Sequence, residues 1–240
     1  MSANPLLPDK VAIITGAAGA LGRDALRVFL EEGAQVAACD MVEVPMEAMG
    51  LSPEARHRCM PVRYDVTTAR GAADLAAHAL RQFGRVDALL NIVGGWRGGV
   101  PLQETAVEEW EGMLTLNLTS AFLCCRAVLP HMLERQSGRI VNVSSRTAVV
   151  PVPRQAAYNS AKAGVIALTQ TLAEEVKASG ITVNCVLPSI LDTEANQKAF
   201  PKADYGKWVK PADLARVLAF LVSDGSSQIT GAAIPVYGRA

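Results

Sequence analysis

Residues 10–40 read KVAIITGAAGALGRDALRVFLEEGAQVAACD, and this stretch decides the fold. Residues 10–15 form a short apolar run rich in β-branched side chains, which predicts a buried parallel strand. The glycine-rich residues 15–22 follow and lead into a helical pattern that ends at Gly33. Residues 35–40 predict a second strand. Strand, turn, helix and strand in this order indicate a parallel sheet covered by helices.

The glycine-rich turn is a candidate phosphate-binding site. Glycine lets the backbone approach a pyrophosphate, and the dipole of the following helix favours the anion. A tight turn without a ligand is the alternative. Asp40 favours the ligand, because a carboxylate about twenty residues after such glycines accepts hydrogen bonds from a ribose diol and repels a 2′-phosphate. No lysine or arginine lies inside the turn or directly after Asp40, so we expect NAD, with NADP the less favoured cofactor.

Strand-like and helix-like segments alternate along the rest of the chain. Further strands are expected over residues 60–66, 86–93, 139–144, 181–187 and 232–237. Helices are expected over residues 67–84, 105–137, 153–179 and 210–223, with a short helix and a loop between residues 42 and 61. This alternation predicts one α/β domain, residues 1–240, whose doubly wound parallel sheet of about seven strands carries helices on both faces. Residues 189–209 are expected to form a long polar loop with an amphipathic middle.

Composition excludes several functional classes. The 23 basic and 23 acidic residues cancel, and no basic run marks a nucleic-acid partner. We expect no membrane span, no signal peptide and no metal site, because apolar runs are short and the histidines lack ligand spacing. The five cysteines are odd in number and form no C-x-x-C motif. They predict reduced thiols in a cytoplasmic protein.

A second stretch, residues 145–162, carries the candidate chemistry. Tyr158 and Lys162 are four residues apart and share one face of a helix, and Ser145 follows the strand of residues 139–144. A free phenol has a pKa of about 10, and we expect the nearby lysine cation to lower it. A hydroxyl, a phenol and an ammonium group can together move a proton on and off a substrate oxygen. A tyrosine and a lysine at this spacing also occur by chance in many proteins, so the rest of the sequence must decide whether these residues are catalytic.

The surroundings place the candidate groups at one edge of the predicted sheet. Such sheets bind ligands at the carboxyl ends of their strands. The groups expected there are the glycine turn, Asp40, Asp65, Gly94, Ser145 and Pro188. Asn117 lies in the middle of the helical pattern of residues 105–137, where asparagine is unfavourable. It marks either a functional kink or the cap of a broken helix.

Taken together, these motifs resemble the short-chain dehydrogenase/reductase family of the classical type over essentially the whole chain. The resemblance rests on Thr15-Gly16-x-x-x-Ala20-x-Gly22, Asp65-Val66, Asn91-x-x-Gly94, Asn117, Ser145, Tyr158-x-x-x-Lys162, and Pro188 followed by Thr193. It implies a Rossmann-like fold and a homotetramer or homodimer. It also implies hydride transfer between nicotinamide and a carbonyl or alcohol.

The resemblance assigns a role to each matching residue. Tyr158 would be the general acid/base, Lys162 would lower its pKa and bind the nicotinamide ribose, and Ser145 would orient the substrate oxygen. Asn117 would hold a water that links Lys162 to solvent. Ile92 departs from the family pattern, where a second asparagine is usual, and this puts that part of the cofactor wall in doubt. The implied cofactor contacts are Gly16, Ala18, Gly19, Ala20, Leu21, Gly22, Asp40, Asp65, Val66, Asn91, Gly94, Tyr158, Lys162, Pro188, Ile190 and Thr193.

The substrate side shows a narrower resemblance to dihydropteridine reductases. It rests on the glycine-rich loop around Trp96 and on Leu187-Pro188-x-x-Leu191-Asp192-Thr193-x-x-Asn196, with Trp208 following. Those reductases typically lack the serine that is present here as Ser145. The expected substrate contacts are Trp96, Arg146, Gln155 and Trp208. Reduction of a quinonoid pterin, 3-oxoacyl reduction and a catalytically silent NAD-binding regulator are the alternatives, although nothing marks a docking surface for an acyl carrier.

Overall fold

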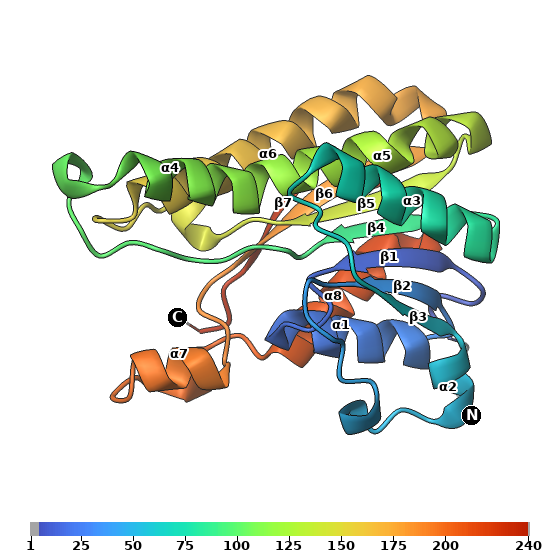
Figure 1. Ribbon diagram of the computed structural model, residues 1–240, viewed down its shortest axis with the longest axis horizontal. Helices are drawn as coiled ribbons and strands as arrows, with labels where there is room; N and C mark the ends of the chain where they lie inside the picture. Colours follow the sequence, from blue (N-terminus) through green and yellow to red (C-terminus); the bar gives the residue numbers. More distant parts are fainter. Residues whose placement is uncertain (1–4, 240) are drawn as a thin grey trace.

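The computed structural model describes residues 5–239, which form one parallel sheet with helices on both faces (Figure 1). The seven strands lie in the order β3-β2-β1-β4-β5-β6-β7, which confirms the predicted doubly wound fold. Their bounds are β1 Val11–Thr15, β2 Gln35–Cys39, β3 Cys59–Val62, β4 Ala88–Asn91, β5 Gly138–Val143, β6 Ile181–Pro188 and β7 Ala233–Val236.

The helices form two layers. α1 and α8 cover one face of the sheet, and α3, α5 and α6 cover the other (Figure 1). The helix bounds are α1 Ala20–Glu31, α2 Pro53–His57, α3 Ala69–Phe83, α4 Val107–Leu114, α5 Ser120–Arg135, α6 Ala156–Val176, α7 Glu194–Ala199 and α8 Pro211–Val222. Thr68 caps α3, and Gly84 ends it in the left-handed conformation, as the sequence predicts.

Each central strand is buried on both faces. Along β1, Ala12 and Ile14 pack beneath α1 and α8, whereas Ile13 packs beneath α3 and α5. Side chains of a strand alternate between the two faces of a sheet, so only a continuous apolar run buries both faces. This two-sided burial explains why the strands in the sequence are short apolar runs rather than alternating ones.

The structure departs from the expected elements in three main places. The strand expected over residues 60–66 ends at Val62, so Asp65 and Val66 lie beyond it. The expected helix of residues 105–137 contains a π-helical segment, Thr115–Thr119, between α4 and α5, and Asn117 lies at its centre. Of the two interpretations of Asn117, the structure therefore supports the local distortion of a continuous helix. The expected loop of residues 189–209 holds α7 and a single 3₁₀ turn, Tyr205–Lys207, because Thr193 and Asp204 each cap a helical turn.

The continuous helix of residues 107–135 is long and apolar enough to cross a membrane by length and composition alone. Its inner face, with Cys124, Val128 and Met132, packs into the core beside the sheet. A buried core helix of a globular protein has the same composition, so we interpret the segment as part of the fold.

Candidate active site

The glycine turn brings the backbone of β1 against the backbone that follows β4. Gly16 has φ +70°, and a Cβ there would lie 3.0 Å from the backbone nitrogen of Val93. A Cβ on Gly22 would collide with the carbonyl oxygen of Gly16 and with the Ala17 backbone. No side chain caps the N-terminus of α1 at Gly19, so the first N–H groups of the helix are available to a ligand. A close-packed glycine turn with free N–H groups fits the pyrophosphate of a dinucleotide.

Asp40 lies beside this turn at the end of β2. One carboxylate oxygen accepts a hydrogen bond from the Ala18 N–H at 3.0 Å. The other accepts from the N–H groups of Met41 and Val42 at 2.7 and 3.2 Å. Asp65, beyond β3, accepts from the N–H and hydroxyl of Thr67 at 3.0 and 2.6 Å, and Val66 is buried. Hydrogen bonds from backbone N–H groups therefore fix the Asp40 carboxylate close to the glycine turn.

Ser145 and α6 assemble the expected catalytic groups. Ser145 follows β5 directly, is 8% exposed and hydrogen-bonds the Tyr158 phenol. Lys162, one helical turn after Tyr158, is buried, and its Nζ donates to the Val143 carbonyl oxygen at 2.8 Å. Ser144 Oγ donates to the Lys162 carbonyl oxygen at 2.7 Å and so ties α6 to the end of β5. The structure thus brings together the three groups that the sequence separates by 17 residues.

The electrostatics of these groups differ from the expectation. Burial raises the pKa of Tyr158, and the hydrogen bond from Ser145 opposes this rise. Burial lowers the pKa of Lys162 from 10.5 to about 8. The Lys162 Nζ lies 5.9 Å from the centre of the Tyr158 ring and is held by the Val143 carbonyl. Lys162 therefore does not produce the expected lowering of the Tyr158 pKa in this arrangement.

Asn117 fixes the glycine-rich loop after β4. Its side-chain nitrogen donates to the Gly95 carbonyl at 3.0 Å, and its oxygen accepts from the Gly95 N–H at 3.1 Å. Gly94 packs against both Asn117 and Lys162, since a Cβ there would lie 2.8 Å from Asn117 Oδ1 and 3.1 Å from Lys162 Nζ. The amide of Asn117 thus holds backbone in this structure, and Gly94 lies beside the ammonium group.

Asn91 points into the core rather than along the outer wall of the site. Its amide nitrogen donates to Asn142 Oδ1 at 2.8 Å and to Cys125 Sγ at 3.4 Å, and Asn142 donates to Thr169 on α6 at 2.9 Å. Thr15, at the end of β1, is tied to the segment that follows β4, because its hydroxyl oxygen accepts a hydrogen bond from the Ile92 N–H at 3.1 Å. Sequence reasoning named Thr15 only as part of the glycine motif, without this contact, and it missed Asn142 and Ser144. Each of these residues is polar and lies at or near the end of an apolar strand, and this pattern could have indicated a residue that supports the site.

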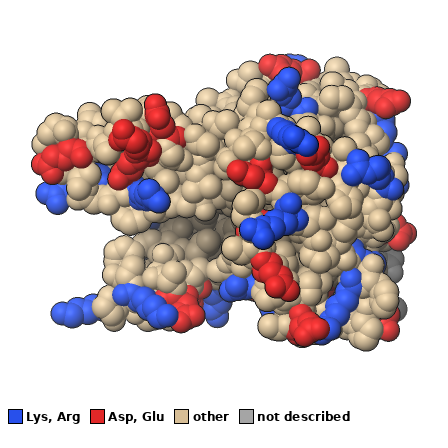
Figure 2. All heavy atoms as spheres, in the orientation of Figure 1, with Lys and Arg blue, Asp and Glu red and all other residues tan. Residues whose placement is uncertain are grey.

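The loop after β6 completes the edge of the sheet. Pro188 ends β6 and is buried, whereas Ile190 is exposed. Thr193 caps α7 by accepting from the Asn196 N–H at 3.2 Å. Figure 2 shows a hollow between the part of the molecule that carries α4 and the part that carries α7. This hollow opens at the carboxyl ends of the strands.

The four expected substrate contacts differ in exposure. Trp96 is exposed, and Gln155 precedes α6 and is half-buried. Arg146 places its guanidinium 5.0 Å from the centre of the Tyr237 ring. Trp208 is buried, with its ring 4.8 Å from that of Tyr205 and 6.3 Å from that of Phe200. Trp208 therefore packs the base of the loop of residues 189–209.

Known proteins with the same features identify the family. A profile of the short-chain dehydrogenases matches residues 10–204. The chain belongs to the short-chain dehydrogenase/reductase family. It is accordingly an NAD(P)-dependent oxidoreductase that acts on CH–OH groups, and the alternative of a catalytically silent regulator is not supported.

Several relatives match along nearly the whole chain. (2S)-[(R)-Hydroxy(phenyl)methyl]succinyl-CoA dehydrogenase subunit BbsD of Thauera aromatica is 35% identical, covering 97% of this chain and 96% of that protein. Cis-4-hydroxycyclohexanecarboxylate dehydrogenase of Sinomonas cyclohexanicum is also 35% identical, covering 96% of each. 3-Oxoacyl-[acyl-carrier-protein] reductase FabG of Thermotoga maritima is 32% identical, covering 97% and 98%. The crystal structure of gox2181 superimposes with a TM-score of 0.86 at 30% identity, covering 97% and 95%.

Proposed function

We propose that this short-chain dehydrogenase/reductase transfers hydride between NAD(H) and a secondary alcohol or ketone of largely apolar character, with Tyr158 as the general acid/base. One observation carries the proposal. Tyr158 hydrogen-bonds Ser145, and the buried Lys162 lies on the same helix face against Gly94. This arrangement gives one phenol the partners needed to exchange a proton with a substrate oxygen.

One group of residues would bind the cofactor, and another would orient the substrate and transfer the proton. When bound, the nicotinamide cofactor supplies the hydride chemistry. The glycine turn and the uncapped start of α1 would hold its pyrophosphate, and Asp40 would hold the adenosine ribose. The Ser145 hydroxyl would donate a hydrogen bond to the substrate oxygen and align it with the Tyr158 phenol. Tyr158 would give its proton to that oxygen in reduction and take it back in oxidation.

Asp40 supports a preference for NAD over NADP. Three backbone N–H groups, of Ala18, Met41 and Val42, hold the carboxylate in place. A fixed negative charge there would repel a 2′-phosphate and accept hydrogen bonds from an unmodified ribose. Arg23 is the cation that follows the glycine turn most closely in the sequence, and its guanidinium donates to the Ala18 carbonyl oxygen at 2.9 Å.

Exposed apolar side chains around the site support an apolar substrate. Val149, Val150 and Val152 follow Ser145 in the segment before α6, Trp96 follows β4 and Phe200 ends α7, and each is 42–55% exposed. These residues all lie in segments that follow the carboxyl ends of β4, β5 and β6, where contiguous exposed apolar surface would mark a ligand site. Two relatives are named for a phenyl-bearing and a cyclohexane-based alcohol, and the apolar ring beside each alcohol group agrees with this proposal.

A quinonoid pterin is the second candidate substrate. The exposed Trp96 favours it, because an indole face can stack on a flat ring. Trp208, the other aromatic residue of that resemblance, is packed among Tyr205 and Phe200 and offers no comparable exposed face. The apolar alcohol is therefore the leading candidate.

The enzyme would act as a cytoplasmic homotetramer or homodimer. All five cysteines are free, which suits a reducing compartment. An apolar groove between α5 and α6, lined by Phe122, Leu129, Leu133 and Leu168, offers a surface on which a second subunit can pack.

A substrate panel tests the proposal. NADH absorbance would be followed with cyclohexanol, 1-phenylethanol, 4-hydroxycyclohexanecarboxylate, a linear polyol, a 3-oxoacyl thioester and a quinonoid dihydropterin. We expect turnover of the ring alcohols with NAD and much weaker turnover with NADP. Turnover of the polyol alone would overturn the apolar substrate, and turnover of the pterin alone would establish the second candidate.

A further inference from the structure

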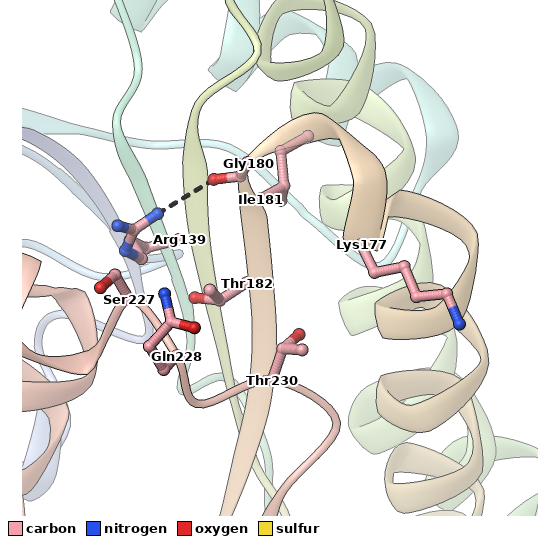
Figure 3. A pocket seen from close by; sticks show the side chains of 8 residues that line it. All are labelled: Arg139, Lys177, Gly180, Ile181, Thr182, Ser227, Gln228 and Thr230. Atoms are coloured by element: carbon pink, nitrogen blue, oxygen red, sulfur yellow. Dashed lines mark hydrogen bonds between the residues drawn. The ribbon is translucent and has the colours of Figure 1, made fainter.

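A second cavity lies at the opposite edge of the sheet from the active site. It has a volume of about 380 Å³ and opens among the amino ends of β5 and β6 and the loop between α8 and β7. Its walls come from segments far apart in the sequence and include Arg139, Thr182, Ser227, Gln228 and Thr230 (Figure 3). We propose that this cavity binds a phosphate group, either inorganic phosphate or the phosphoryl group of a small metabolite.

Arg139 supplies a positioned positive charge. One terminal nitrogen of its guanidinium donates to the carbonyl oxygens of Gly138 and Gly180 at 2.9 and 3.2 Å. Its Nε is buried without a hydrogen-bond partner, and none of the ion pairs within residues 5–239 involves Arg139. The nearby Asp224 is paired with Lys10 at 2.6 Å. Together with the hydrogen-bonded Lys10, the Arg139 guanidinium lowers the pKa of Asp224, but it forms no ion pair of its own in this described part of the chain and is held by backbone carbonyls, which leaves it able to bind an oxyanion.

Thr182 supplies the second observation. Its side chain is 5% exposed, and its hydroxyl has no hydrogen-bond partner. Buried hydroxyl groups in proteins nearly always have a partner, so the Thr182 hydroxyl, which has none among residues 5–239, can accept a hydrogen bond from, or donate one to, a group bound beside it. In Figure 3 the Thr182 hydroxyl faces the Gln228 amide, and the Arg139 guanidinium lies next to Ser227.

The remaining groups are hydrogen-bond donors rather than carboxylates. Ser227 and Gln228 are exposed at the rim, and Thr230 accepts from the Val183 N–H at 3.2 Å, which leaves its own hydroxyl proton free to donate. Lys177 contributes its apolar stem, since its ammonium group pairs with Glu174 at 2.6 Å and points away from the other residues in Figure 3. One guanidinium with several neutral donors around it matches a tetrahedral oxyanion better than a cation or an apolar ligand.

Titration with inorganic phosphate tests the site. Calorimetry would be done with the dinucleotide cofactor in excess, so that the glycine turn is filled, and in chloride of matched ionic strength. We expect saturable binding by the wild-type enzyme and at least a tenfold weaker affinity in Arg139→Met. Arg81→Met, which removes an exposed arginine of α3, is the matched control and should bind as the wild type does.

Thr182→Val keeps the shape of the side chain and removes only the hydroxyl. It therefore tests the contribution of the hydroxyl to phosphate binding without disturbing the fold. Removal of an unpaired buried hydroxyl should leave the melting temperature in chloride equal to or above that of the wild type. The same variant should lose most of the rise in melting temperature that phosphate gives the wild type. Absence of saturable binding, or equal binding by wild type, Arg139→Met and Thr182→Val, would overturn the proposal. Tighter binding of glycerol 3-phosphate than of phosphate would support a phosphorylated metabolite as the ligand.

Discussion

The buried ammonium of Lys162 has a consequence for stability at the scale of a single residue. Its pKa is about 8 in the folded chain, against 10.5 for an ordinary lysine. Between these two values the unfolded chain binds more protons, so folding should become more favourable as the pH rises from about 8 to 10.5. One pKa unit corresponds to about 1.4 kcal/mol, so the gain is at most roughly 3.5 kcal/mol.

Lys162→Met removes this titration. We expect the difference in free energy of unfolding between wild type and variant to shift in favour of the wild type from pH 8 to pH 10.5, as measured by urea denaturation at fixed ionic strength. A difference that stays constant over this range would show that the ammonium group is not buried as described.

Asp40 governs cofactor choice by its charge. Asp40→Asn keeps an oxygen that can accept from the Ala18 N–H but removes the carboxylate that repels a 2′-phosphate. The ratio of kcat/KM for NADP to that for NAD should rise at least about tenfold, which corresponds to about 1.4 kcal/mol. Glu43→Gln removes an exposed carboxylate three residues further along the same loop and serves as the control. An equal change in both variants would argue for a general charge effect.

At the scale of an element, the glycine turn limits how closely α1 can approach β1. A Cβ at Gly22 would meet the backbone of Gly16 and Ala17, which can move only if the turn opens. Gly22→Ala should therefore destabilise the fold by about 1–3 kcal/mol and weaken NAD binding. Gly112→Ala on α4, where a Cβ meets nothing within 4 Å, should stabilise by up to about 1 kcal/mol. Similar effects of both substitutions on unfolding would contradict the close packing of the turn.

The elements also show what could be predicted from the sequence. The strands and most helices followed from apolar runs, glycines and caps, because these signals are local. The sheet edge and the helix spacing predicted that Ser145, Tyr158 and Lys162 lie near one another, but the role of each residue needed the resemblance, since Ser145 and Tyr158 come from different elements. The π-helical segment at Asn117 was only half predicted, because its cause is tertiary: the Asn117 amide bonds the backbone of Gly95 in another segment. The upward shift of the Tyr158 pKa was missed because the burial of this phenol depends on tertiary packing that no local pattern in the sequence indicates.

At the scale of the whole molecule, the groove between α5 and α6 predicts association. Leu133 is 36% exposed at this groove, and a charge there would have to be desolvated in an interface. Leu133→Glu should shift the mass measured by light scattering from a tetramer or dimer toward smaller species. Leu102→Glu, outside the groove and more exposed, should leave the mass unchanged. A monomeric wild-type protein would contradict the proposed assembly.

The central claim is that Tyr158 moves the proton while the rest of the site binds the cofactor. The most direct measurement compares wild type and Tyr158→Phe for NADH-linked turnover of a ring alcohol and for NAD affinity by calorimetry. Loss of the phenol hydroxyl should lower kcat/KM by at least about 100-fold, since general acid/base catalysis typically contributes that much or more. NAD affinity should change little. Near-wild-type turnover by Tyr158→Phe with unchanged NAD affinity would contradict the account.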